Sequence, residues 1–316
     1  MKVLIVGAGA VGQVYGQHLQ MGGAEVWYFV KPEHVGAARQ GFVLYDLRKS
    51  PQPPPLLFHP AGVLTTTDEV ARQKWDQIWL SISSPALRGP WLESFLSSIG
   101  EATLVNLTPG LDDRSYLERR FPAERLISGV IAIIAWQTPL PTEKRPRPGI
   151  AYWIPPFAAS LYDGPSATEV PISSIVATLG RSGCPARRQH DAAFLGGLAS
   201  AAMLPIIRGI ELDGWSLSRF ARGGRSALAA RAGREAMTVV ARASGRKIPW
   251  SRHLVGGPVV RIALTLAPHL VPFDLEAYLQ HHFTKVGDQT RQMLGDYVAR
   301  GTTIGCPVAA LVDLSR

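Results

Sequence analysis

Short apolar runs alternate with longer amphipathic runs over the first part of the chain. The apolar runs, which are typical of strands buried on both faces, include residues 2–6, 24–30, 78–83 and 102–107. Two stretches that follow them, 91–99 and 113–121, have the helical period. Strand and helix in alternation predict an α/β domain built on a mostly parallel sheet.

The same domain is expected to take up a further β section before the pattern changes. Residues 126–136, 150–154 and 185–189 predict strands, and residues 171–179 predict a helix. Beyond His190 the strand pattern stops, and residues 192–212, 217–244, 252–267 and 274–300 all predict helices. We therefore predict an α/β Rossmann-like domain over residues 1–188, followed by an all-α domain over residues 189–316.

A glycine-rich turn joins the first strand to the first helix. Gly7, Gly9 and Gly12 form a G-x-G-x-x-G fingerprint, with Ala10 and Val11 between the last two glycines. Gly7 allows the tight turn, Gly9 a close backbone approach to a pyrophosphate, and Gly12 close packing of helix on strand. The helix N-terminus then offers free N–H groups to the phosphates. We predict that residues 7, 9, 10, 11 and 12 bind a dinucleotide.

The end of the second strand predicts which dinucleotide is bound. An acidic residue there favours NAD, whereas a cation accommodates the 2′-phosphate of NADP. The strand ends at Lys31 with no carboxylate at its tip, although Glu33 follows closely. We therefore predict NADP, with Lys31 at the 2′-phosphate. Ser83 and Asn106 follow the next two strands and are expected to border the cofactor, since ligands bind at the carboxyl ends of parallel strands.

Composition restricts the partners more than it identifies them. The net charge is +9 and the pI about 9.8, but the arginines are scattered, so we expect no nucleic-acid partner. Cys184 and Cys306 are far apart, which predicts neither a metal site nor a disulfide framework. The most apolar stretch, residues 192–207, is too short to span a bilayer and predicts a buried core helix. With no signal peptide expected, we predict a cytoplasmic protein with no membrane partner.

The order of these motifs resembles that of the ketopantoate reductase family, the 2-dehydropantoate 2-reductases. The resemblance covers nearly the whole chain: the glycine turn, Lys31, Gly41-Phe42, Glu235 with the turn at residues 243–249, and Gly305-Cys306-Pro307. It implies NADPH-dependent reduction of a 2-keto acid, in which a lysine on the first helix of the second domain protonates the alkoxide. A small carbonyl substrate and a homodimer are the partners that we expect.

The chain departs from this family at the catalytic positions. Alignment on Pro205 places Gly196 where the family has its lysine, and Ser200 and Leu204 where it has asparagines. We therefore predict relocated groups: Lys285 as the acid, with Asn106 and Ser200 orienting the substrate. His281, His282 and Asp288 are further candidates, and Lys285 and Asp288 would share one helix face. The alternative is a catalytically degenerate homologue that binds NADP as a sensor or regulatory protein.

Overall fold

The protein folds into two compact units, described by a computed structural model that covers residues 1–48 and 51–315. One unit comprises Met1–Pro139 with Glu143–Ala193, and the other comprises Leu140–Thr142 with Phe194–Arg316. The domain boundary that we predicted after residue 188 stays a prediction.

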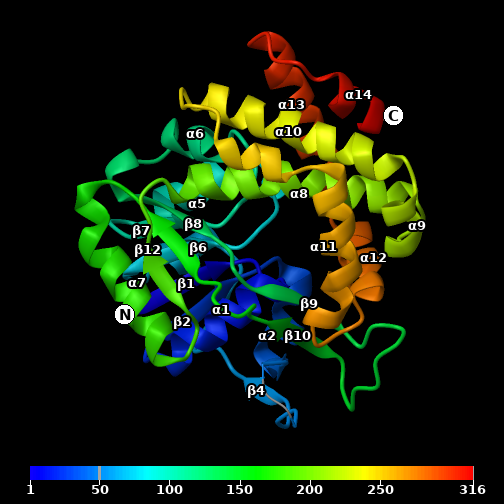
Figure 1. Ribbon diagram of the computed structural model, residues 1–316. Coiled ribbons are helices and arrows are strands. Elements are labelled where there is room, and N and C mark those ends of the chain that lie inside the picture. The colour runs from blue at the N-terminus through cyan, green and yellow to red at the C-terminus, as the bar shows by residue number, and fades with distance from the viewer. Residues whose placement is uncertain (49–50, 316) are drawn as a thin grey trace. The chain divides into compact units, whose positions relative to one another are not determined.

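An eight-stranded sheet forms the centre of the first unit, in the order β12-β11-β8-β7-β6-β1-β2-β5 (Figure 1). Its strands are β1 (Lys2–Val6), β2 (Glu25–Phe29), β5 (Gly62–Leu64), β6 (Gln77–Leu80), β7 (Thr103–Asn106), β8 (Leu126–Val130), β11 (Ser160–Asp163) and β12 (Ala186–Arg188). Every neighbouring pair is parallel except β8 and β11. The prediction of a mostly parallel sheet is confirmed.

Helices cover both faces of this sheet. Alternate residues of β1 point to opposite faces, so Val3 and Ile5 join one apolar core while Leu4 and Val6 join another. The first core includes side chains of α1 (Ala10–Met21) and α7 (Glu169–Arg181). The second includes side chains of α3 (Thr67–Ala71), α5 (Trp91–Ser98) and α6 (Asp113–Glu118). Burial of both faces explains why the strands read as continuous apolar runs.

A second, four-stranded sheet in the same unit was not predicted as a separate sheet. Its order is β4-β3-β10-β9, formed by Leu56–Phe58, Phe42–Asp46, Gly149–Trp153 and Ile134–Thr138. Phe42 and Tyr152 of this sheet lie in the same core as Val14 and Tyr15 of α1. Helix α1 is therefore buried between the two sheets. The remaining elements of the unit are η1 (Pro32–His34), α2 (Val35–Gln40), α4 (Ser84–Leu87), η2 (Ala123–Arg125) and η3 (Ser166–Thr168).

His18 is a buried histidine on α1. Its Nδ1 lies 3.1 Å from Ser182 Oγ, its ring meets Tyr152 edge-on, and its Nε2 is buried without a hydrogen-bond partner in the described part of the chain. Burial, and then the positive charge of Arg48, lower the pKa of His18 to about 4. The imidazole is therefore neutral in the folded protein at neutral pH.

We expect this histidine to make the protein sensitive to mild acid. Its pKa is about 6.5 when unfolded and about 4 when folded, so the unfolded state binds more protons between these values. Stability is therefore full above pH 6.5 and falls as the pH drops, by roughly 2 to 3 kcal/mol at pH 4.5. The free energy of unfolding is measured in urea at pH 7 and at pH 4.5. Between these two values His18→Gln should lose less stability than the unsubstituted protein, and the difference should equal this amount. Replacement of the exposed His34 by Gln is the control, and equal losses in all three proteins would refute the assignment.

Helices make up the second unit (Figure 1). They are α8 (Ala192–Leu212), α9 (Leu217–Arg222), α10 (Arg225–Ala243), η4 (Trp250–Leu254), α11 (Gly257–Leu270), α12 (Leu275–Lys285), α13 (Gly287–Thr303) and α14 (Ala309–Ser315). Helix α10 contacts α9, α11, α13 and α14, and its buried side chains are mostly small, which lets these helices approach closely. Glu235 on α10 accepts hydrogen bonds from the N–H groups of Ala310 and Leu311, at 3.2 and 3.0 Å. It thereby holds the amino end of α14.

Helix α8 is, among the described helices, the one that is long and apolar enough to cross a membrane by itself. Over its most apolar window 39% of the residues are buried, and the buried positions Leu198, Ala201, Leu204 and Ile207 recur every three or four residues. This recurrence is what a helix with one core-facing side produces. Helices α11 and α12, bent by 105° at their junction, meet the same criterion as a pair.

Candidate functional site

The glycine turn after β1 has the geometry that its sequence predicts. Gly7 has a φ of +92°, and its N–H donates to the carbonyl of Phe29 at 3.0 Å. A Cβ at Gly7 would lie 2.8 Å from the backbone oxygen of Ser81, closer than real Cβ atoms approach. Backbone conformation and space therefore both require glycine at this position.

The amino end of α1 is open at Gly9. This residue is the N-cap, no side chain bonds to the free N–H groups of the first turn, and a Cβ built on it would meet nothing within 4 Å. Gln13 donates from its side chain to the carbonyl of Ala8 at 2.8 Å, which fixes the turn. The residues present therefore fit a phosphate group, which free N–H groups and the helix dipole both favour.

Glycines also bring α1 close to the strands. A Cβ at Gly12 would lie 2.5 Å from the carbonyl oxygen of Gly7, and one at Gly16 would lie 2.0 Å from the Tyr28 hydroxyl. That hydroxyl donates to the carbonyl of Gly12 at 2.7 Å. The first turn of α1 is thus held directly against β2, which keeps its N–H groups in a fixed place.

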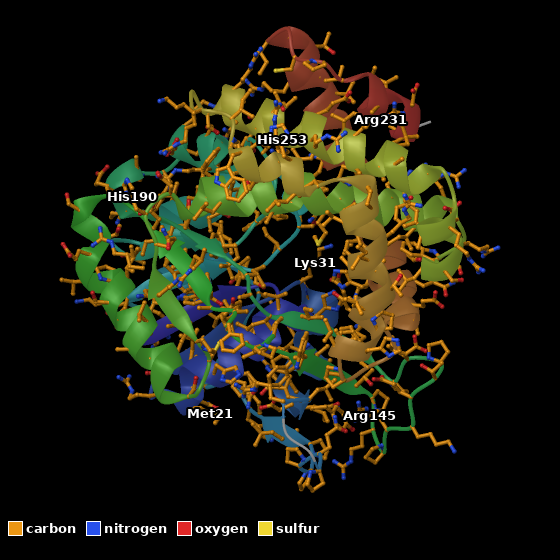
Figure 2. The ribbon with its side chains drawn as sticks, in the orientation of Figure 1. Met21, Lys31, Arg145, His190, Arg231 and His253 are labelled. Carbon is orange, nitrogen blue, oxygen red and sulfur yellow. The ribbon has the colours of Figure 1, made fainter. Side chains whose placement is uncertain are left out.

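Lys31 lies just beyond the end of β2 (Figure 2). It is exposed and, among the described residues, has no ion-pair or hydrogen-bonding side-chain partner. Glu33, which follows on η1, is exposed as well. The ammonium group of Lys31 is therefore available to an anionic ligand.

A polar network that the sequence analysis missed joins the loops after β6 and β7. Asp113 is 1% exposed and accepts from Ser84 Oγ at 2.6 Å, from Arg88 at 2.7 Å and from the Gly110 N–H at 2.8 Å. Ser83 caps α4 by accepting from the Ala86 N–H at 3.4 Å. The strand pattern could have indicated this network, because both loops follow neighbouring parallel strands whose carboxyl ends meet at one edge of the sheet.

Asn106 is buried at the end of β7. Its Oδ1 accepts from the N–H and the hydroxyl of Thr108, at 3.1 and 2.7 Å. Within the described structure this amide therefore shapes the loop Thr108-Pro109-Gly110. Its predicted contacts with substrate and cofactor stay predictions.

A cavity of about 790 Å³ lies within the helical unit, beside α12. It is lined by Pro141, Thr142, Gly214, Trp215, Ser216, Asp274, Glu276, Ala277, Gln280, His281, Thr284 and Lys285. Asp274 caps α12 by accepting from the Ala277 N–H, and Glu276 accepts from the Leu217 N–H at 2.7 Å. Each carboxylate therefore already accepts one backbone hydrogen bond. Lys285 is exposed and has no side-chain partner in the described part of the chain. His281 Nε2 is buried and likewise unpartnered there.

His282, the neighbouring candidate, has a different environment. Burial, followed by the charges of Lys285 and His281, lowers its pKa to about 4. Its ring stacks on Tyr278 at 5.4 Å and meets Phe283 edge-on. A neutral imidazole packed between aromatic rings acts as part of the core rather than as an acid.

Two expectations about this region need correction. The stretch predicted as one helix over residues 274–300 is two helices, because the chain breaks at Val286 between α12 and α13. Lys285 and Asp288 therefore do not share a helix face, and Asp288 pairs with Arg291 at 2.7 Å instead. Ser200 lies half-buried on α8 with no hydrogen-bond partner among the described residues. Its predicted substrate contact, like that of Lys285, stays a prediction.

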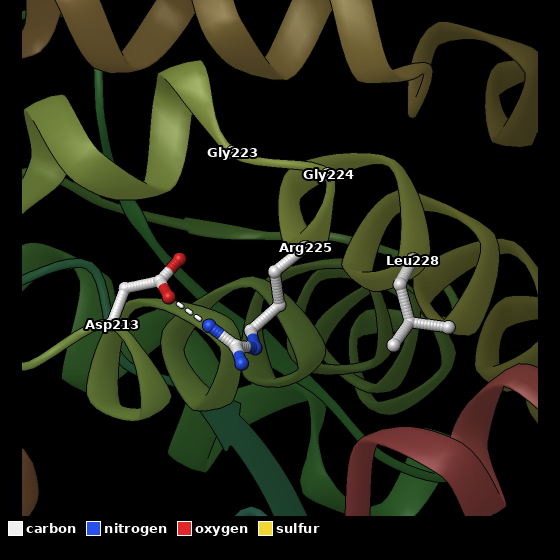
Figure 3. Close-up of a pocket in the computed structure, with 5 residues that line it drawn as sticks. All are labelled: Asp213, Gly223, Gly224, Arg225 and Leu228. Atoms are coloured by element: carbon white, nitrogen blue, oxygen red, sulfur yellow. Dashed lines mark hydrogen bonds and ion pairs between the residues drawn. The ribbon is translucent and has the colours of Figure 1, made fainter.

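A smaller cavity of about 360 Å³ lies beside the start of α10 (Figure 3). Asp213 and Arg225 form an ion pair in it, and Gly223, Gly224 and Leu228 complete its lining. The second oxygen of Asp213 is buried without a partner in the described residues. The carboxylate is already neutralised by Arg225, so this cavity does not provide a distinct charge for a ligand.

One group of side chains in the first unit has the spacing of metal ligands. Asp163, His190 and Asp191 place ligand atoms within 4.8 Å of one another. Both oxygens of Asp163 already accept backbone N–H groups, from Gly164 at 2.9 Å and Asp191 at 2.7 Å. His190 is largely exposed, and Figure 2 shows it at the edge of the unit. These bonds account for the geometry of the group, which we therefore do not assign to a metal.

Comparison with known sequences finds a family that resembles the glycine-turn region. Residues 3–142 match the family described as "Ketopantoate reductase PanE/ApbA". Over these residues, fewer than half of the chain, the sequence is similar to that family. No curated protein matches the sequence.

Solved structures extend the likeness to the whole fold. The 2-dehydropantoate 2-reductase of Geobacter metallireducens GS-15 is 17% identical, with a TM-score of 0.74 over 100% of this chain and 98% of that one. The PanE/ApbA family ketopantoate reductase of Ralstonia eutropha JMP134 is 20% identical, with a TM-score of 0.71 over 100% and 96%. A D-mandelate dehydrogenase solved with NADH and anilino(oxo)acetate is 16% identical, with a TM-score of 0.72 over 100% and 96%. The chain therefore has the ketopantoate reductase fold.

Proposed function

We propose that the protein is an NADP-dependent oxidoreductase that reduces a 2-keto acid or a related carbonyl compound by hydride transfer. The observation that carries the proposal is the open amino end of α1 at Gly9, formed by a turn whose geometry requires glycine at positions 7 and 12. The family match over residues 3–142 supports a ketopantoate reductase-like activity. A structural neighbour solved with NADH supports a nicotinamide cofactor. The homodimer and the cytoplasmic location belong to the same proposal.

In this proposal each part of the chain has a separate task. The first turn of α1 binds the pyrophosphate through Gly9, Ala10 and Val11, and Lys31 binds the 2′-phosphate. When bound, NADPH supplies the hydride. The loops held by Asp113 and Asn106 border the nicotinamide side of the cofactor. Lys285 protonates the alkoxide oxygen of the substrate, because an ammonium both stabilises an oxyanion and supplies a proton.

Turnover is tested by following NADPH absorbance with a panel of 2-keto acids, ketones and imines. We expect oxidation of NADPH with at least one 2-keto acid. Gly196 stands where the family has its lysine, and this favours one alternative, a homologue that binds NADP without catalysis. Intact cofactor binding with no turnover on any substrate would establish that alternative. If neither nicotinamide cofactor binds, the whole proposal is wrong.

Lys31→Ala is expected to remove the preference for NADPH over NADH. An ammonium contact to a phosphate contributes enough that its loss should weaken NADPH binding about tenfold. Binding of NADH, which lacks the 2′-phosphate, should not change. Titration by cofactor fluorescence measures both affinities, with Lys74→Ala as the control at an exposed lysine of the same unit. Equal affinities of the unsubstituted protein for NADPH and NADH would exclude this role of Lys31.

A further inference from the structure

Helix α11 presents an apolar stripe to solvent. Val259, Ile262, Leu266 and Leu270 are 50%, 62%, 52% and 72% exposed, and their spacing places them on one side of the helix. Val260 is the one residue of α11 counted as buried. Single exposed apolar residues are ordinary, but four in register along one helix mark a surface that contacts something apolar.

The turn before α11 adds an aromatic residue to the same segment. Trp250 is 75% exposed and Leu254 is 53% exposed, both on η4. Tryptophan is enriched at membrane–water interfaces, where its ring lies in the apolar region and its N–H in the wet one. An exposed tryptophan next to an apolar stripe therefore points to a lipid surface.

The charge around the stripe favours an anionic lipid bilayer over a second copy of the chain as its partner. No Asp or Glu occurs between Glu235 and Asp274, a span that carries Arg242, Arg246, Lys247, Arg252 and Arg261. The helical unit as a whole has 15 Lys and Arg against 8 Asp and Glu. Helix α9, which packs on α11, adds the exposed Arg219 and Arg222. Two such surfaces facing each other would repel, whereas an anionic surface would attract them.

The length and polar edge of α11 fit a helix that lies along a bilayer. Its 14 residues extend about 21 Å, which is shorter than the roughly 30 Å of hydrocarbon that a spanning helix crosses. Beside the apolar stripe, Arg261, Thr265 and His269 form an exposed polar edge without an acid. Apolar residues on one side and cations at the edge are the features of helices that bind membranes from the interface.

We propose that η4 and α11 form a docking surface for anionic phospholipid bilayers, with the stripe Val259, Ile262, Leu266 and Leu270 inserted among the lipid chains. Arg261, on the polar edge of α11, would attract the headgroups. The sequence-based prediction of no membrane partner rested on the lack of a spanning segment, and a helix lying on the surface needs none.

Vesicle sedimentation with the full chain tests this proposal. Vesicles of phosphatidylcholine alone are compared with vesicles that contain about one third phosphatidylserine. We expect binding to the anionic vesicles that weakens at high salt. The double variant Ile262→Ser/Leu266→Ser should reduce the partition coefficient by roughly tenfold or more, because two apolar side chains no longer insert among the lipid chains. Arg261→Gln should reduce it roughly fivefold.

The controls separate lipid binding from folding and from self-association. Thr302→Ser, at an exposed position of α13 outside the proposed surface, should leave partitioning unchanged, and thermal unfolding checks that each variant is folded. Failure to bind either kind of vesicle, or binding that the double variant does not weaken, would overturn the proposal. Sedimentation equilibrium provides the remaining test: a dimer that dissociates in the double variant would assign the stripe to a second copy instead.

Discussion

Gly9→Ala is expected to weaken NADPH binding about a hundredfold while leaving the fold intact. Gly9 has an ordinary φ of −71°, and an added Cβ meets no atom of the chain within 4 Å, so the protein itself tolerates alanine there. The methyl group would instead occupy the space into which we place the pyrophosphate. Calorimetric titration measures the affinity. The free energy of unfolding without nucleotide, measured by thermal denaturation, should change by less than about 1 kcal/mol.

Gly36→Ala is the matched control for this substitution. Gly36 lies on α2 in the same unit, and a Cβ there also meets nothing within 4 Å. It should change neither affinity nor fold, apart from a small gain in helix stability. Unchanged NADPH affinity in Gly9→Ala would show that the amino end of α1 does not hold the phosphates.

Lys285→Ala is expected to lower kcat about a thousandfold, within the range found for general acids. Lys285 lines the 790 Å³ cavity, and no described residue neutralises its ammonium group. The effect should be mainly on kcat, since the alkoxide forms only during the reaction. Its signature is a lowered kcat with an unchanged KM, which loss of packing alone would not produce.

Lys247→Ala controls for the loss of a surface charge. Lys247 is exposed in the same unit and does not line the cavity. It should leave kcat unchanged, whereas Lys285→Arg should retain part of the activity by keeping the positive charge. If Lys285→Ala turns over as fast as the unsubstituted protein, the proton comes from another group, and His281 becomes the next candidate.

The parts of the fold that depend on local pattern could be predicted from the sequence. The strand, glycine turn and helix over the first 21 residues follow from apolar runs and the space that glycine alone leaves. Helix α8 has its predicted bounds, Ala192–Leu212, because its apolar period is continuous. The break at Val286 was missed, since polar residues on both sides continue the helical period and only the fold ends it.

Long-range pairing is what the sequence did not reveal. The second sheet depends on β10 lying parallel to β3, with Ile150 opposite Leu44, and neither strand carries a local mark of its partner. The Asp113 network likewise joins residues 25 to 29 positions apart. Asp113 lies at the start of α6, where a carboxylate could cap the helix, but no side chain makes a cap hydrogen bond there. A carboxylate at a helix start fits either role, and only the position of Ser84 and Arg88 decides between them.

Helix α1 has little freedom to move, because Tyr15 and Val14 are fully buried between two sheets and the Tyr28 hydroxyl holds its first turn. An anion arriving at its amino end would therefore meet donors that are already oriented. Binding of a ligand would then require little ordering of the protein. The contacts between the anion and these N–H groups would therefore contribute to affinity without an offsetting cost of rearrangement.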